Sequence, residues 1–269
     1  MCLLLIAVDV VPDVPLLLLG NRDEFHERPS ATARPWSEDE RIVGGRDLVA
    51  GGSWLAVRAD GRFAAVTNLR TGVPATAPRS RGWLVRDFVL GDMSAVEYLD
   101  LLHADVESYG PFNLVLGDRN GAWARGSADA AARRLDTGVH VVSNGPIGVH
   151  WPKTERLQER FIAEVRAASA ALRASDLLDL LADEWRAPDS ALPDTGVGAE
   201  LERVLAPVFI RGEKYGTRAS TLVGFGSGAS VALYERSYAA GGVVVATSGW
   251  ISERGERFVE AGGENGLIG

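Results

Sequence analysis

The chain has 269 residues, of which 46% are hydrophobic and 24% charged, enough apolar material for a large core in one domain or two. Lys and Arg number 28 against 36 Asp and Glu, so the net charge of −8, with no basic run, argues against a nucleic-acid partner. The single cysteine excludes an internal disulfide.

The chain begins with two short apolar runs, residues 3–8 and 16–19, separated by the turn-forming segment 11–15. Such runs are typical of strands buried on both faces. A signal peptide is not indicated, because no basic segment precedes the first run and Asp9 and Pro12 interrupt it. No apolar stretch reaches the roughly 20 residues that span a bilayer. We therefore expect a soluble, cytoplasmic protein with no integral membrane segment.

Glycine-containing turns predict three hairpins farther along the chain, and a last strand follows them. Asp-Gly and Asn-Gly pairs favour the tight turns that join antiparallel strands. The first predicted pair is Trp54–Arg58 with Arg62–Thr67 around Asp60-Gly61, and the second is Phe112–Gly117 with Ala122–Arg125 around Asn120-Gly121. The third pair is Ser220–Phe225 with Ser230–Glu235, joined through Gly226-Ser227-Gly228. The last predicted strand is Gly242–Ser248.

Helical patterns fall into two blocks. In the first, residues 80–90 precede Ser94–Glu97, which has the form of a capping box. In the second, apolar residues recur at four-residue steps after Pro152, and Leu177–Leu181 forms another apolar patch. Batches of hairpins with two blocks of helices predict an α+β sandwich in one domain, residues 1–269, with 187–198 as an exposed loop.

Cys2 is the first candidate for chemistry. Removal of Met1 would leave an α-amino group on the residue that carries the thiol. That amine has a reference pKa of about 7.7–8.0 and the thiol one of about 8.5, so the amine can serve as the base near neutral pH. The alternative is a buried structural thiol in a strand.

Five further polar candidates lie where strands are expected to begin or end. Arg22 could stabilise a thiolate, and Asp23 could orient the α-ammonium group; a surface turn is the alternative. Asn68 and Asn144 could donate to an oxyanion, although asparagine is equally common in plain turns, and Arg218 precedes the third hairpin.

Other catalytic patterns are missing from the sequence. The four histidines form no H-E-x-x-H motif and no cysteine pair exists, so a zinc site has little support. No G-x-S-x-G motif marks a serine nucleophile. Gly44-Gly45 and Gly51-Gly52 lack a following phosphate-loop lysine and are interpreted as tight turns or as places where backbone approaches a ligand.

Several of these segments together resemble the NRDE-motif family, also called the transport and Golgi organisation protein 2 family. They follow the family order from residue 2 to about residue 225. The resemblance is carried by Met1-Cys2, Asn21–Glu24, Gly44–Leu48, Ala50–Leu55, Val66–Asn68, Ser143–Pro146, Trp151–Thr154 and Gly216–Arg218.

The order of these elements is similar to that of the cysteine N-terminal-nucleophile (Ntn) hydrolases, which include penicillin V acylase and bile salt hydrolase. The similarity implies a four-layer αββα fold with two stacked antiparallel sheets. It implies Cys2 as nucleophile, Asp23 with Arg22 as the charged pair near the α-amine, Asn68 and Asn144 as oxyanion and substrate-orienting residues, and Arg218 as a distal arginine. Because Arg22 and Asp23 are adjacent, a regular strand cannot point both into one site, which favours Asp23.

Two functions follow from the resemblance. The first is an amidohydrolase that cleaves a C–N bond of an acylated small molecule through a thioester, with no cofactor required. The second is a non-catalytic protein that binds or carries haem or an acyl lipid, as the association of eukaryotic relatives with haem movement and lipid metabolism suggests, with Cys2 as a haem ligand. The sequence predicts neither the substrate, nor whether Met1 is removed, nor the oligomeric state.

Overall fold

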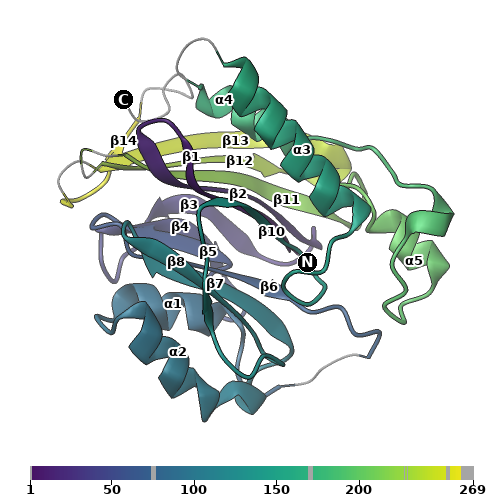
Figure 1. Cartoon of the computed structure of the whole chain (residues 1–269), viewed down its shortest axis with the longest axis horizontal. Helices are drawn as coiled ribbons and strands as arrows, with labels where there is room; N and C mark the ends of the chain where they lie inside the picture. Colours follow the sequence, from purple (N-terminus) through teal and green to yellow (C-terminus); the bar gives the residue numbers. More distant parts are fainter. Residues whose placement is uncertain are drawn as a thin grey trace.

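Two seven-stranded antiparallel sheets stack face to face at the centre of the protein (Figure 1). The computed structural model describes residues 2–73, 77–168, 172–226, 228, 230–252 and 255–261. The first sheet has the strand order β10-β1-β2-β11-β12-β13-β14 and the second β3-β4-β5-β6-β7-β8-β9. The predicted pairing of the first two apolar runs is confirmed, because β1 and β2 form a hairpin with Leu5 opposite Leu19.

The strands of the first sheet are β1 (Cys2–Val11), β2 (Val14–Phe25), β10 (Gly138–Val142), β11 (Tyr215–Phe225), β12 (Val231–Tyr238), β13 (Val244–Ser252) and β14 (Val259–Glu260). Those of the second sheet are β3 (Ser30–Pro35), β4 (Ile42–Asp47), β5 (Leu55–Arg58), β6 (Phe63–Asn68), β7 (Phe112–Asp118), β8 (Gly121–Gly126) and β9 (Arg133–Arg134). The three predicted hairpins correspond to β5–β6, β7–β8 and β11–β12. Ser227, in the third predicted turn, lies outside the described residues.

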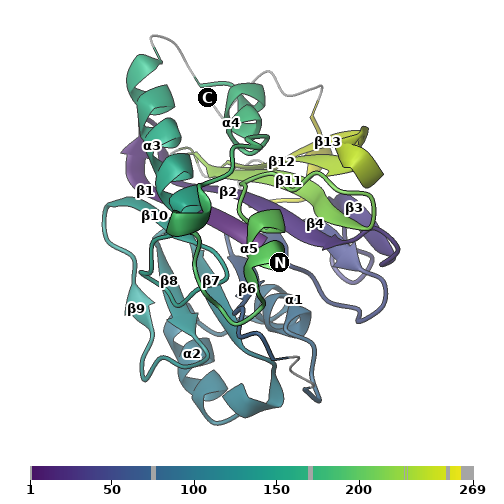
Figure 2. The ribbon, with the colours of Figure 1, turned by 90° about the vertical axis from the view of Figure 1, so that its right-hand side faces the viewer.

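Helices cover the outer face of each sheet, which completes four layers (Figures 1 and 2). Ser94 caps α2 through the expected capping box with Glu97. Helices α1 (Gly82–Leu90) and α2 (Ala95–His103) pack on the second sheet, and α3 (Pro152–Ala167) and α4 (Ala174–Leu180) pack on the first. The remaining helical segments are α5 (Ala199–Val204) and the short 3-10 helices Val106–Ser108, Asp189–Ala191 and Ala240–Gly242.

Alternate residues of β1 fill two different core layers. Leu4 and Ile6 belong to the apolar cluster between the sheets, whereas Leu3 and Leu5 face α3 and α4. A strand whose two faces are both buried needs apolar residues at every position, which is why β1 is apolar without alternation. The apolar run therefore places Cys2 in the core layer between the sheets, at the first residue of β1.

Three local features differ from the sequence prediction. Strand β2 continues through the polar residues to Phe25, so Arg22 and Asp23 are in a strand rather than in a turn. Strands β3 and β4 were not predicted, and Gly44 lies within β4. A Cβ on Gly44 would be 2.6 Å from the carbonyl oxygen of Leu55, so this glycine permits close approach of β5 rather than of a ligand.

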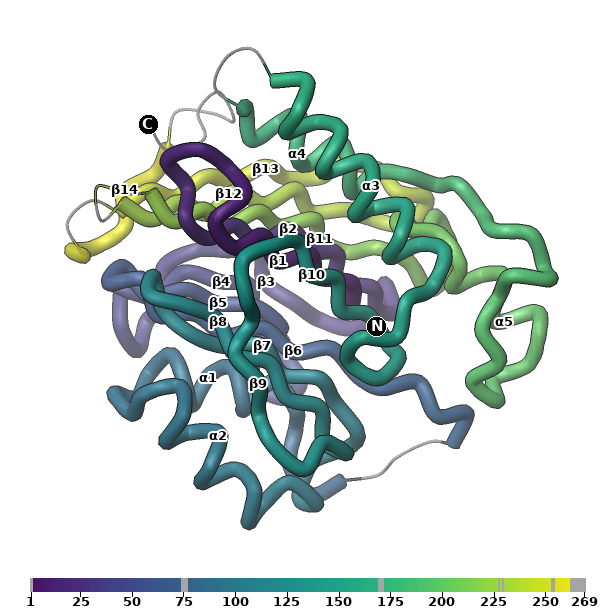
Figure 3. Tube along the Cα trace, viewed as in Figure 1, coloured from purple at the N-terminus to yellow at the C-terminus, as the bar shows by residue number. Residues whose placement is uncertain are grey.

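The tube trace shows β1 running between β2 and β10, with the N-terminal end of β1 on the side of the molecule where β6 ends (Figure 3). This arrangement brings the start of β1 to the end of β6. Among the described helices, none combines the length and apolar character needed to cross a membrane.

Candidate active site

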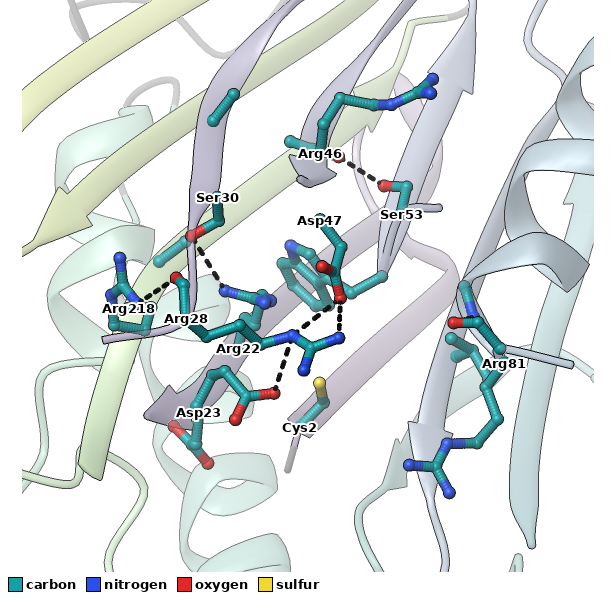
Figure 4. Close-up of a pocket in the computed structure, with 18 of the residues that line it drawn as sticks. Cys2, Arg22, Asp23, Arg28, Ser30, Arg46, Asp47, Ser53, Arg81 and Arg218 are labelled. Atoms are coloured by element: carbon teal, nitrogen blue, oxygen red, sulfur yellow. Dashed lines mark hydrogen bonds and ion pairs between the residues drawn. The ribbon is translucent and has the colours of Figure 1, made fainter. Parts of the chain in front are cut away.

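A cavity of about 430 Å³ contains the Cys2 side chain in its wall and is lined by residues from both sheets (Figure 4). Five of the six predicted site residues line it: Cys2, Arg22, Asp23, Asn68 and Arg218. The sixth, Asn144, is fully buried behind the wall. The tertiary structure thus gathers residues that are more than 200 positions apart in the chain.

Cys2 and Arg22 are direct register partners on β1 and β2, so their side chains lie on the same face of the first sheet. Cys2 is 7% exposed, and burial raises the pKa of its thiol, as does the negative charge of Asp23, while Arg22 lowers it. The thiol is therefore protonated at neutral pH, and a nucleophilic attack requires a base to remove its proton.

Asp23 points to the opposite face of the sheet from Arg22, as strand geometry requires. The hydroxyl of Thr217, its register partner on β11, donates to Oδ1 of Asp23 at 2.7 Å. Burial raises the pKa of Asp23, and Lys153 and the Thr217 hydrogen bond lower it. Both Arg22 and Asp23 nevertheless line the cavity, contrary to the expectation that only one would reach it, because they lie where the sheet begins and side chains on either face border the opening.

Asn68 and Asn144 form a pair in which one amide holds the other. The Asn144 side-chain amide donates to the backbone oxygen of Asn68 at 2.9 Å and to its Oδ1 at 3.1 Å. Asn68 ends β6 and lines the cavity, and within the described residues its own side-chain N–H groups have no hydrogen-bond acceptor. Asn144 therefore holds the Asn68 side chain in place at the cavity wall.

Arg218 lies at an irregularity in β11 between Thr217 and Ala219, which turns its side chain into the cavity. Its guanidinium donates to the carbonyl oxygens of Phe25, His26 and Arg28, at 2.9, 3.3 and 3.2 Å. Burial and the nearby Arg22 lower its pKa. Arg218 thereby holds in place the backbone at the end of β2 and just after it, and it adds positive charge to the cavity wall.

Sequence analysis missed several cavity residues that come from the second sheet and its connections. Arg28 forms an ion pair with Asp47 at 2.7 Å, and Arg81 enters from the start of α1 (Figure 4). Glu235 of β12 is also in the wall, where its carboxylate accepts from the backbone N–H of Ala33 at 2.7 Å. Only the abundance of Arg over Lys hinted at this lining, and composition does not show where the arginines gather.

A buried charged cluster supports the wall behind Asp23. Arg70 and Glu202 form an ion pair of 2.5 Å, with side chains 5% and 4% exposed. Lys153 is also buried, its ammonium group donates to the carbonyl oxygen of Leu205 at 3.0 Å, and burial lowers its pKa to about 8. The Arg70 backbone N–H donates to the carbonyl oxygen of Asn144 at 2.7 Å, which connects the cluster to the asparagine pair. No group of three or more metal-ligating side chains occurs among the described residues.

Comparison with known proteins identifies relatives and structural neighbours. The family described as Transport and Golgi organisation 2 matches residues 1–240. The human transport and Golgi organization protein 2 homolog is 31% identical over 240 residues, 82% of this chain and 86% of that protein. The Drosophila melanogaster transport and Golgi organization protein 2 is 34% identical over 161 residues, 54% of this chain and 52% of that protein.

Among solved structures, the C2A mutant of the conjugated bile acid hydrolase from Clostridium perfringens superimposes with a TM-score of 0.51 at 9% identity. The similarity covers 100% of this chain and 99% of that one. The R18L variant of the same hydrolase gives the same values. At this identity the likeness concerns the fold, which is the predicted αββα arrangement of the Ntn hydrolases.

Proposed function

The chain belongs to the transport and Golgi organisation 2 family, and from that starting point we propose that it is an N-terminal cysteine hydrolase that cleaves the C–N bond of an acylated small molecule. The observation that carries the proposal is the placement of Cys2 at the start of β1, in the wall of a cavity that Arg22, Asp23 and Asn68 also line. The names of the relatives specify no reaction, so the proposal rests on this site.

The reaction begins after Met1 is removed. The α-amino group of Cys2 accepts the thiol proton, and Sγ attacks the amide carbonyl carbon. Asn68 donates to the oxyanion, and Arg22 on the same sheet face stabilises the negative charge that develops at sulfur. The C–N bond then breaks, the amine leaves with the proton from the α-ammonium group, and water hydrolyses the thioester to the acid.

Burial of the thiol makes the internal base necessary. A buried thiol with a raised pKa carries little thiolate of its own, so proton transfer must accompany attack. The buried carboxylate of Asp23, held by Thr217, is placed to orient the ammonium group that results. If Met1 stayed in place, the nitrogen of Cys2 would be an amide and could not act as the base.

Intact-mass measurement and a panel of N-acyl amides test the proposal. We expect the purified protein to lack Met1, the active protein to form an acyl adduct, and Cys2→Ala to form none; Cys2→Ser keeps a weaker nucleophile and serves as the matched variant. Retention of Met1 in every molecule, or equal hydrolysis by wild type and Cys2→Ala, would refute the proposal.

The alternative function, binding of haem with Cys2 as axial ligand, does not fit the lining. A porphyrin ring needs a largely apolar pocket, whereas this wall carries ten charged side chains. They are Arg22, Arg28, Arg46, Arg79, Arg81, Arg218, Asp23, Glu24, Asp47 and Glu235. A haem titration of wild type and Cys2→Ser gives the direct check: equal absorbance changes, or none, are expected.

A further inference from the structure

The cavity wall contains arginines of two kinds, which differ in whether an acidic side chain neutralises them. Arg28, Arg46 and Arg79 form ion pairs with Asp47, Glu38 and Asp105 respectively. Arg22, Arg81 and Arg218 have no carboxylate within 4.0 Å among the residues that the structure describes. Three guanidinium groups in one cavity thus lack a direct ion pair among the described residues, and only the longer-range charge of Glu24, acting on Arg81 and Arg218, and of Glu235, acting on Arg22, offsets theirs.

Each member of this unpaired set is held differently. Nη1 of Arg218 donates to three carbonyl oxygens, although its buried Nε has no hydrogen-bond partner among the described residues. Arg22 faces Cys2 across the β1–β2 pair and makes one hydrogen bond, 3.4 Å, to Oγ of Ser30. Arg81 makes one long hydrogen bond, 3.4 Å, to the carbonyl oxygen of Pro111. Arg22 and Arg81 therefore both keep N–H groups that can bind an anion. Arg22 faces the nucleophile, so Arg81 is the arginine available for a second anionic group of the ligand.

The backbone that carries Arg81 is fixed against the second sheet. The Ser53 backbone N–H donates to the carbonyl oxygen of Gly82 at 3.1 Å. A Cβ on Gly52 would lie 2.4 Å from the carbonyl carbon of Gly82, so the two segments are in close backbone contact. The Trp83 indole N–H donates to the Ala50 carbonyl oxygen at 2.6 Å. Arg81 is consequently presented from a rigid base, which lowers the cost of ordering it around a ligand.

Arg81 also interacts with the nucleophile's charge. Burial lowers the pKa of its guanidinium, and the thiolate form of Cys2 opposes that effect. In Figure 4 Arg81 lies on the side of Cys2 opposite to Arg22 and Arg28. A ligand whose amide carbonyl lies at Sγ therefore has Arg22 on one side and Arg81 on the other.

From these contacts we infer that the substrate of this site is an anionic acyl amide, and that Arg81 binds its carboxylate or phosphate group. A partly buried cation without a direct ion pair is costly, and an anionic ligand reduces that cost while gaining charge-assisted hydrogen bonds. The planar guanidinium can contact two oxygens of either group at once. This inference rests on the proposed hydrolase function, but binding tests it separately from catalysis.

The test uses the Cys2→Ala variant, which cannot turn over, and matched pairs of ligands titrated by calorimetry. N-octanoylglycine against N-octanoylglycinamide places a carboxylate on the amine side. Suberic acid monoamide against octanamide places one on the acyl side. N-octanoylphosphoethanolamine against N-octanoylethanolamine offers a phosphate. We expect at least one charged member to bind about 10- to 100-fold more tightly than its neutral partner.

Variants at Arg81 identify the residue responsible. In the Cys2→Ala background, Arg81→Gln should reduce the preference for the charged ligand to about onefold, and Arg81→Lys should retain part of it. Arg79→Gln is the matched control, because Arg79 lines the same cavity but is paired with Asp105, and the preference should persist in it.

Two results would overturn the inference. One is that, in all three pairs, the charged ligand binds no more tightly than its neutral partner, or that no ligand binds at all. The other is that the preference for the charged ligand survives in Arg81→Gln. Failure of the hydrolase proposal has a different signature, since wild type would then bind the charged ligand selectively without releasing its amine.

Discussion

Replacement of Asn144 by alanine tests how the site holds its oxyanion donor. Asn144 is fully buried and does not line the cavity, yet it donates two hydrogen bonds, of 2.9 and 3.1 Å, to Asn68. Their loss leaves two acceptors of Asn68 without that donor, which should lower the free energy of unfolding by about 2 kcal/mol. It also frees the Asn68 amide to rotate away from the oxyanion position. Removing an oxyanion donor outright costs about 100- to 1000-fold in rate, so misplacing one should cost about 100-fold.

The assay is acylation of mature protein by 4-nitrophenyl butyrate, followed by the burst of 4-nitrophenolate and by intact mass, with urea unfolding measured on the same samples. Asn113→Ala is the control, because buried Asn113 supports the same turn by donating to the carbonyl oxygens of Ser143 and Gly145, and its amide donates to Thr67 rather than to Asn68. We expect Asn113→Ala to lose similar stability and no more than about tenfold in acylation rate. If folded Asn144→Ala acylates as fast as the parent, the assignment of Asn144 as the support for Asn68 is wrong.

Three further predictions concern the frame around the site. Glu202→Gln should lower the free energy of unfolding by about 3–5 kcal/mol because it removes the carboxylate that forms the buried ion pair with Arg70. The double variant with Arg70→Met should cost less than the sum of the two single changes, and additive losses in urea unfolding would contradict the buried pair. Because burial lowers the pKa of Lys153 to about 8 from 10.5, the unfolded chain binds this proton more tightly. The free energy of unfolding should then rise by about 3 kcal/mol between pH 8 and pH 10.5, a rise that Lys153→Met should lack. Gly52→Ala should lower the melting temperature, because its methyl carbon would meet Gly82 backbone at 2.4 Å; unchanged thermal unfolding would argue against the close contact that fixes α1.

Much of the fold follows from local patterns in the sequence. Asp60-Gly61 and Asn120-Gly121 predicted hairpins that the structure contains as β5–β6 and β7–β8, because these dipeptides favour the backbone angles of tight turns. The continuous apolar run after Cys2 predicted a strand buried on both faces, and β1 is one. Strands β3 and β4 escaped prediction because the glycines of β4 and the alanines and proline of β3 have weak strand preference. Pairing of β4 with β5, and of β3 with β4, decides their conformation.

The candidate site, like the fold, was predictable from the sequence only in part. By itself the sequence determined that one cysteine stands at position 2, at the head of a buried strand, and that polar residues follow or precede other strands, because these are properties of neighbouring residues. Only the tertiary structure decided that Arg22 faces Cys2, that Asn144 holds Asn68 from behind, and that Arg81 enters the cavity without an acidic partner among the described residues. Register, burial and ion pairing join residues far apart in the chain, and such contacts depend on how the two sheets stack.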